Sequence, residues 1–280
     1  MMLTVTVTDS KDGYAWGLDR SAFSVYDNKV QQEIAFFKGE DAPASVGILL
    51  DTSGSMGRPD NTRDDTRFKL LREGLARFLN LSSKTNEYFV IGFNERPSIL
   101  TDWTRDVEVV LESLSNIEAD KNTAFYDACY VGIEQVVRGT HPKHVLILLT
   151  DGQDNDSRRK LSDVRRLLKQ TDVLIYAVIL PSGEYATGIG SPILEGPYIL
   201  KSLASLTGGK VFIPRTRAKL NAAFEELALE LRRQYRIGFT PASDGKWHSI
   251  KIKVTPPPNA PRLSARSREG YDAPAAANQR

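Results

Sequence analysis

The hydrophobic positions between residues 43 and 234 follow two alternating patterns. Short, continuously apolar runs indicate buried strands, and longer stretches with apolar residues at helical spacing indicate amphipathic helices. We predict strands at Val46 to Leu50, Glu87 to Phe93, Pro97 to Thr101, His144 to Thr150, Val173 to Leu180 and Lys210 to Ile213. We predict helices at Arg67 to Leu79, Asp106 to Leu114, Phe125 to Val137, Leu161 to Lys169, Tyr198 to Leu206 and Arg217 to Tyr235. This order predicts an α/β fold with a doubly wound, Rossmann-like, mostly parallel sheet. The turn before Pro97 predicts one antiparallel edge strand.

The two flanks, residues 1–42 and 235–272, have a different pattern, with short segments of alternating polarity separated by turns. The segments are Leu3 to Thr8, Ala22 to Tyr26, Gln31 to Phe37, Tyr235 to Thr240, Trp247 to Val254 and Arg262 to Ala265. Neither flank alone has enough strands to stabilise a sheet. We therefore predict that the flanks pair into one small β-sandwich, with the α/β domain of residues 43–234 inserted between them. Two separate edge extensions of the main sheet are the alternative. Residues 273–280 are predicted to form a disordered tail.

Three polar segments stand at predicted element ends. Asp51-Thr52-Ser53-Gly54-Ser55 follows the first predicted strand of the α/β domain, Thr123 opens a predicted helix, and Asp151-Gly152 follows the strand that ends in Thr150. Ligands of open α/β sheets bind outside the carboxyl ends of the strands. Carboxylate and hydroxyl oxygens are hard ligands that suit Mg²⁺, Ca²⁺ or Mn²⁺. A turn with side-chain capping bonds would explain the first segment equally well. The three segments together favour a metal site.

These three segments resemble the metal-ion-dependent adhesion site of von Willebrand factor type A domains, written D-x-S-x-S, then Thr, then Asp. The resemblance covers roughly Ala44 to Tyr235. It implies that the metal ligands are Asp51, Ser53, Ser55, Thr123 and Asp151. The implied cofactor is Mg²⁺, or Mn²⁺ or Ca²⁺ in its place. Similar sites leave one coordination position open, which implies recognition of a protein partner through an Asp or Glu carboxylate.

The surroundings of this site supply further predictions. The residues predicted to form a rim contacted by the partner are Gly54, Met56, Gly152 and Asp154. The long stretch from Pro181 to Gly196 lies at the same edge, where long loops are often functional. Arg158-Arg159-Lys160 with Arg165-Arg166 predicts a basic helix. Most such runs are solvated faces, and the alternative is a landing site for an acidic partner.

Catalytic interpretations meet obstacles at Ser53. The aspartic-protease loop D-[ST]-G needs glycine at that position, and no second copy of the loop is present to complete a carboxylate dyad. A haloacid-dehalogenase-like phosphatase needs a second acid there, which would act as the general acid/base. We therefore predict a binding module with no catalytic residue. A metal-dependent, phosphatase-like hydrolase using Asp51 stays open as the alternative.

Composition sets outer limits on function. The 280 residues include 37 basic and 35 acidic side chains, and a net charge of +2 predicts no general attraction to nucleic acid or membranes. No apolar stretch is long enough to span a bilayer. The single cysteine, Cys129, is predicted to be a buried apolar residue. The start of the chain lacks the apolar core of a signal peptide. The strand-rich opening and Gly270-Tyr271 resemble bacterial type A-related proteins that are generally exported, which favours a removed leader over a cytoplasmic location.

Overall fold

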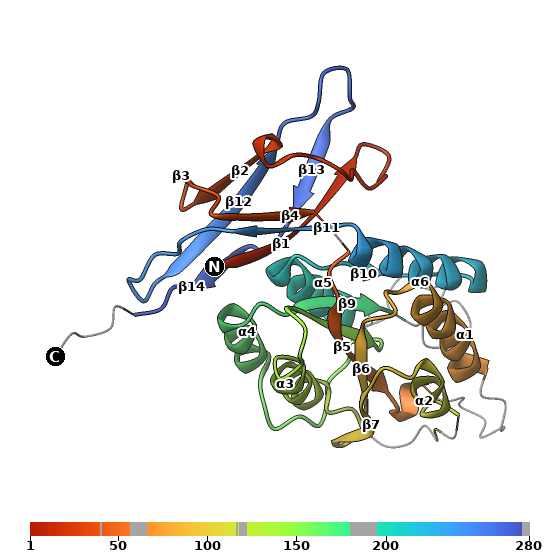
Figure 1. The fold of residues 1–280 in the computed structure, drawn as a ribbon. Helices are drawn as coiled ribbons and strands as arrows, with labels where there is room; N and C mark the ends of the chain where they lie inside the picture. Colours follow the sequence, from red (N-terminus) through yellow and green to blue (C-terminus); the bar gives the residue numbers. More distant parts are fainter. Residues whose placement is uncertain (40, 57–65, 116, 118–121, 180–194, 276–280) are drawn as a thin grey trace.

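The α/β part of the molecule is a twisted six-stranded sheet between two layers of helices (Figure 1). The computed structural model describes residues 1–39, 41–56, 66–115, 117, 122–179 and 195–275, without the side chains of residues 55, 66 and 67. The sheet order is β10-β9-β8-β5-β6-β7. Its strands are β5 (Ala44–Asp51), β6 (Glu87–Phe93), β7 (Pro97–Thr104), β8 (Lys143–Leu149), β9 (Leu174–Val178) and β10 (Val211–Phe212). All pairings are parallel except that of β6 with β7, so the predicted antiparallel edge strand is confirmed.

Helices cover both faces of this sheet, as a doubly wound fold requires. The helices are α1 (Thr66–Leu81), α2 (Val107–Glu112), α3 (Phe125–Val136), α4 (Leu161–Gln170), α5 (Glu195–Thr207) and α6 (Arg217–Arg232). One apolar core joins α1, α2 and α6 to one face, and a second joins α3, α4 and α5 to the other. Every residue of the central strand β5 is buried, which explains why this strand reads as a continuous apolar run. Cys129 is buried in the second core, as predicted.

The flanks of the chain pair with each other in two antiparallel sheets, in the order β13-β1-β11-β4 and β14-β12-β2-β3. Their strands are β1 (Met2–Asp9), β2 (Phe23–Asp27), β3 (Val30–Gln32), β4 (Phe36–Gly39), β11 (Gln234–Gly238), β12 (Trp247–Val254), β13 (Leu263–Arg266) and β14 (Gly270–Asp272). A third apolar core is shared by residues of both flanks. None of these strands pairs with the six-stranded sheet within the described residues, so the edge-extension alternative is wrong. Gly39 ends β4 and Ala44 begins β5, which places the sandwich beside the amino ends of the parallel strands (Figure 1).

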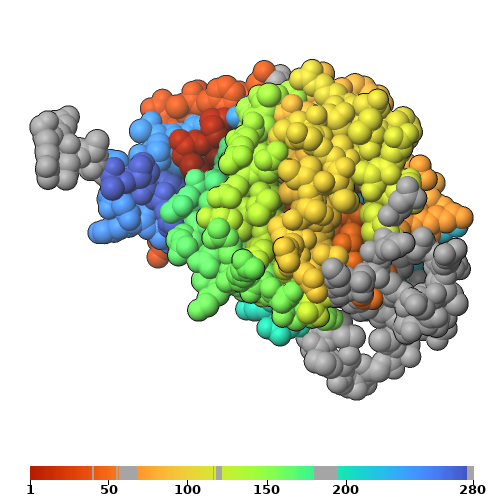
Figure 2. All heavy atoms as spheres, turned by 90° about the horizontal axis from the view of Figure 1, so that it is seen from below, coloured from red at the N-terminus to blue at the C-terminus, as the bar shows by residue number. Residues whose placement is uncertain are grey.

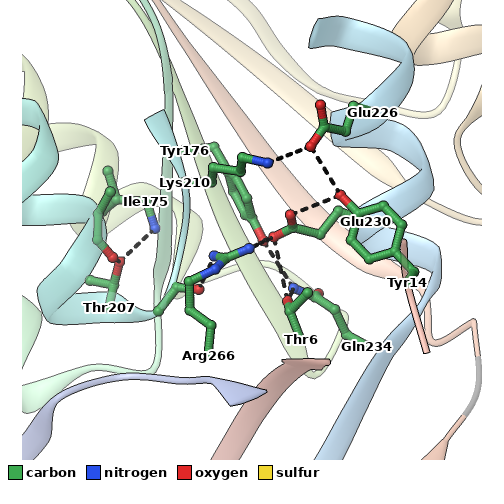
Figure 3. Close-up of polar contacts among 12 residues, drawn as sticks. Thr6, Tyr14, Ile175, Tyr176, Thr207, Lys210, Glu226, Glu230, Gln234 and Arg266 are labelled. Atoms are coloured by element: carbon green, nitrogen blue, oxygen red, sulfur yellow. Dashed lines mark hydrogen bonds and ion pairs between the residues drawn. The ribbon is translucent and has the colours of Figure 1, made fainter. Parts of the chain in front are cut away.

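A buried carboxylate joins the two parts of the molecule (Figure 3). Glu230 lies in the last turn of α6 and is fully buried. Its Oε1 accepts hydrogen bonds from the hydroxyl of Tyr176 in β9 at 2.5 Å and from Nη2 of Arg266 in β13 at 2.6 Å. Its Oε2 accepts one from the hydroxyl of Tyr14 at 3.0 Å. A buried charge is tolerated only when it is paired and hydrogen-bonded, so these three donors account for an acid at this position.

A histidine cluster inside the sandwich predicts a pH dependence of stability. His248 Nδ1 lies 2.6 Å from Asp27 Oδ1, and Nε2 lies 3.1 Å from Asp244 Oδ1. The hydrogen bond to Asp27 raises the pKa of His248 above its ordinary value, against an opposing effect of burial. The stabilisation from the protonated ring is therefore complete below the unfolded pKa of about 6.5 and is lost as the pH rises through the higher folded pKa. We expect the free energy of unfolding in urea to fall less steeply from pH 6 upward in His248→Gln than in the wild type. An equal slope of this free energy against pH would contradict the assignment.

Two predictions about helix and tail boundaries are wrong, and other predictions concern residues outside the described ranges. The helix predicted from Arg217 to Tyr235 ends at Arg232, because Arg233 departs from helical geometry and β11 begins at Gln234. The tail is ordered at its start, since Ala273 is buried and its N–H donates to the carbonyl of Lys246. Residues 276–280, most of the predicted loop from 181 to 196 and the polar stretch 57–65 lie outside the described residues. No helix in the described ranges is both long and apolar enough to cross a bilayer.

Candidate functional site

Asp51 ends the central strand β5 with its carboxylate fully buried. Its Oδ1 accepts hydrogen bonds from the N–H of Ser53 at 3.0 Å and from the Ser53 hydroxyl at 2.5 Å. Its Oδ2 accepts a hydrogen bond from the hydroxyl of Thr150 at 2.6 Å, across from the end of β8. The chain therefore closes a tight turn after β5 around one carboxylate, and that carboxylate also joins the two central strands.

Burial makes the charged form of Asp51 less favourable than it would be in water. Burial raises the pKa of Asp51 to about 6, although the hydrogen bonds from Ser53 and Thr150 oppose this shift. The charge of nearby Asp151 raises it further. Two carboxylates near one another in a buried place repel, and a bound cation would relieve that repulsion.

Asp151 has one buried carboxylate oxygen without a hydrogen-bond partner among the described residues. The residue is 3% exposed, and its Oδ1 accepts a hydrogen bond from the N–H of Gln153 at 3.0 Å. Its Oδ2 is buried and has no hydrogen-bond partner among the described residues. Most buried polar side-chain atoms are hydrogen-bonded, so an unpaired carboxylate oxygen indicates an ion or water that completes it.

Thr123 is held at the same edge of the sheet by the loop that follows Asp151. The N–H of Thr123 donates to Oδ1 of Asn155 at 2.8 Å, and the N–H of Asn155 donates to the Thr123 carbonyl at 2.9 Å. The next residue, Ala124, donates its N–H to the carbonyl of Asn94, just past β6. The ends of β5, β6 and β8 and the start of α3 are thus tied together, and Figure 2 looks onto this end of the molecule.

The donor set fits a hard divalent cation. Ser53 contributes a hydroxyl oxygen, and the hydrogen of that hydroxyl is donated to Asp51. The unpaired Oδ2 of Asp151 supplies a carboxylate oxygen. Within the described ranges, no three His, Cys, Asp or Glu side chains are placed so that they could hold a metal ion, so a site here depends on hydroxyls as well as acids. The side chain of Ser55 lies outside the described part of the structure.

A contact between two glycines positions the Asp151 loop. Gly152 has a φ of +81°, a conformation that other residues rarely adopt, and it packs against Gly196 in the first turn of α5. A Cβ on Gly196 would lie 2.3 Å from the carbonyl oxygen of Asp151 and 2.9 Å from the carbonyl carbon of Gly152. The start of α5 therefore reaches the backbone of the Asp151 loop only because both residues lack side chains.

The predicted rim residues have different surroundings. Gly54 is exposed in the short 3₁₀ helix η2 (Gly54–Met56), where a partner could reach it. Met56 is 1% exposed in the core under α1, so its side chain cannot form part of a rim. Gly152 is buried against α5. Asp154 is half-buried, and its Oδ1 accepts hydrogen bonds from the N–H of Tyr126 and from the Ser157 hydroxyl. The hydrogen bond from Tyr126 shows that Asp154 accepts from a free N–H group in the first turn of α3.

Sequence reasoning missed the residues that support the predicted ligands. Thr150 holds Asp51, Asn155 holds Thr123, and Asp127 accepts hydrogen bonds from the backbone N–H groups of Arg158 and Arg159. The one available signal was the density of polar residues after β8, in Asp151-Gly152-Gln153-Asp154-Asn155-Asp156-Ser157.

Both oxygens of Asp51 are engaged and the side chain is fully buried, which is unfavourable for a nucleophile. The geometry therefore does not favour the phosphatase alternative.

Comparisons with known proteins agree with this fold. Residues 46–153 match the sequence model of the von Willebrand factor type A domain. Cuticlin-6 of Caenorhabditis elegans is 30% identical over 142 residues, which are 48% of this chain and 23% of that protein.

Two solved structures show the same architecture. A von Willebrand factor type A protein from Catenulispora acidiphila superposes with a TM-score of 0.54 at 14% identity, over 92% of this chain and 74% of that one. The PilB minor pilin from Streptococcus sanguinis superposes with a TM-score of 0.54 at 13% identity, over 70% of this chain and 62% of that one. The chain thus matches less than two thirds of the length of cuticlin-6 and of the pilin. At these identities the structural likeness concerns the fold alone.

Proposed function

We propose that this chain is a divalent-metal-dependent protein-binding module, since residues 46–153 match the model of the von Willebrand factor type A domain and domains of that family are generally involved in adhesion and recognition. The observation that carries the proposal is the buried, unpaired Oδ2 of Asp151 beside the hydrogen-bonded carboxylate of Asp51. The proposed ligands are Asp51, Ser53, Ser55, Thr123 and Asp151, with Mg²⁺, Mn²⁺ or Ca²⁺ as the ion.

The residues around the proposed site would hold a cation and leave it able to bind a further ligand. Asp51 accepts a hydrogen bond from the Ser53 hydroxyl, which holds that hydroxyl beside the buried carboxylate. Asn155 fixes the backbone of Thr123, and Gly196 fixes the backbone of Asp151. When bound, the cation would supply positive charge for a partner carboxylate, because neutral hydroxyls quench its charge less than a cage of acids would. The proposed activity is non-catalytic recognition.

Thermal unfolding in Mg²⁺ and in chelator tests the metal site. A ligand that binds only the folded state stabilises it by RT ln(1 + [L]/Kd), so 1 mM Mg²⁺ at a micromolar site contributes roughly 4 kcal/mol. We expect Ser53→Ala to weaken metal affinity at least tenfold, which removes about 1.4 kcal/mol of this response. Asp51→Ala should abolish the response.

Ser98→Ala is the matched control, because Ser98 is an exposed serine of β7 whose hydroxyl donates to the carbonyl of Gly92, away from the proposed site. It should keep the full metal response. The proposal fails if the wild-type chain melts at the same temperature in chelator as in Mg²⁺, Mn²⁺ and Ca²⁺. Since each variant is compared with itself in chelator, a loss of stability from the substitution cancels.

A further inference from the structure

The chain has a small net charge but contains one strongly basic segment. Residues 158–169 contain six basic residues and one acid, Asp163, and therefore carry a charge of +5. The rest of the chain has 31 basic and 34 acidic residues, a charge of −3. The segment contains the end of the metal loop and nearly all of α4. Positive charge is thus concentrated on one helix and the three residues before it, in an otherwise slightly acidic molecule.

Most of these cations have no carboxylate partner. Arg166 pairs with Asp163 at 2.8 Å, and this is the one ion pair of the segment among the described residues. Arg158 and Lys160 are exposed and form no ion pair with any described residue. Five cations that form no ion pair with any described residue leave a positive local potential on this surface.

Three of the cations are held by neutral groups. The guanidinium of Arg159 lies over the ring of Tyr130, 3.4 Å from its centre. Nη2 of Arg165 donates to the hydroxyl of Ser202 in α5 at 2.9 Å. The ammonium of Lys169 lies 4.5 Å from the centre of the Trp247 ring. These contacts restrict the side chains without cancelling their charge, so less conformational entropy is lost when an anion binds them.

The basic surface is rigidly joined to the proposed metal site. The backbone N–H groups of Arg158 and Arg159 both donate to the carboxylate of Asp127, in the first turn of α3. The same short loop begins at Asp151 and contains Asn155, which holds Thr123. α4 begins beside this loop, whereas its last turn lies against the sandwich, where Lys169 contacts Trp247. A partner that reaches the metal end of the molecule therefore meets the first part of this surface, at Arg158, Arg159 and Lys160.

We infer that the α4 surface, formed by Arg158, Arg159, Lys160, Arg165 and Lys169, docks an acidic segment of a partner protein. Carboxylates match the forked donors of arginine and can pair with several of them in turn. A ten-residue helix is about 15 Å long, which corresponds to roughly five residues of extended chain. The inference rests on the proposed function only where it joins this segment to a carboxylate on the metal.

An acidic polypeptide fits better than a nucleic acid or a membrane. The cations lie on one helix and the three residues before it, while the rest of the chain carries a charge of −3 and repels any larger polyanionic surface. Asp154, Asp156 and Glu195 lie close to the metal loop in sequence or in contact with it. Because these acids repel a long polyanion, the surface favours a short acidic segment whose carboxylates lie opposite the cations of α4.

Fluorescence anisotropy with a labelled hexaglutamate peptide tests the inference on the full chain. We expect the peptide to bind in Mg²⁺ at low salt and to bind at least fivefold more weakly to the double variant Arg158→Gln, Lys160→Gln. The matched control is Lys69→Gln, Arg72→Gln, an exposed lysine and arginine of α1 on the opposite layer, which should stay within twofold of wild type. Labelled hexalysine should not bind.

The outcomes separate this inference from the metal proposal. Binding that persists in chelator and in Ser53→Ala, yet falls in the α4 variant, supports the docking surface even if no metal binds. The inference is overturned if hexaglutamate does not bind, or if it binds the α4 variant as well as wild type. It is also overturned if a ten-residue thymidine oligonucleotide or phosphatidylserine vesicles bind more tightly than the peptide in an α4-dependent way.

Discussion

Glu230→Ala will lower the free energy of unfolding by roughly 1–3 kcal/mol, the usual cost of leaving a buried hydrogen-bonding group without its partner. The substitution leaves Arg266 without its carboxylate and removes the acceptor of the hydroxyls of Tyr14 and Tyr176. Tyr176 is fully buried in β9 and cannot turn to water. Because these groups come from β9, β13 and the segment after β1, the loss should affect the α/β part and the sandwich together.

Chemical denaturation measures this loss, and Glu226→Ala provides the matched control. Glu226 lies one turn earlier in α6 and pairs with Lys210, but both side chains are more than a third exposed. A surface pair of this kind contributes about 0–1 kcal/mol. If Glu230→Ala costs no more than Glu226→Ala, Glu230 does not hold the two parts together.

Gly196→Ala will weaken metal affinity at least tenfold while the fold persists. The new Cβ would lie 2.3 Å from the carbonyl oxygen of Asp151, a backbone atom that cannot turn aside as a side chain can. Either the metal loop or the start of α5 must move, and a ligand displaced by a few tenths of an ångström no longer fits the geometry of a small cation. Alanine favours a helix over glycine by about 1 kcal/mol, so helix propensity acts in the opposite direction.

The measurement is the Mg²⁺-induced rise in melting temperature relative to chelator. Gly132→Ala serves as control, because it adds a methyl group to another buried helical glycine whose close neighbours are side-chain atoms of Leu49 and Leu146. It should lower stability and keep the metal response. An undiminished response in Gly196→Ala would show that α5 does not position Asp151.

Much of the fold could be predicted because its strands and helices differ in apolar periodicity. The central strands β5, β6 and β8 are buried throughout and appear as unbroken apolar runs. The end of α6 could not be placed, because Leu231 and Tyr235 continue a helical spacing across the turn into β11. The three-residue strand β14 is too short to show a period.

The candidate site divides in the same way. Asp51 and Asp151 were predictable because each follows a recognisable strand. Thr150 appeared only as the last residue of its strand, and its hydrogen bond to Asp51 spans 99 positions of sequence. The contact of Gly196 with Asp151 joins a helix start to a distant loop and leaves no local pattern. Such contacts depend on tertiary packing, so they cannot be predicted from the local pattern of a single sequence.

The pairing of the two flanks sets an order for folding. Leu3 in β1 pairs with Ile237 in β11, and Thr6 pairs with Arg266 in β13. Both pairings wait until more than 200 intervening residues have been placed, and contacts so distant in sequence form slowly. The α/β part can complete its own sheet first and bring β4 and β11 close together at its amino end. During synthesis the apolar strands of the first flank therefore stay without their final partners longest, which makes them the segment most dependent on protection from aggregation.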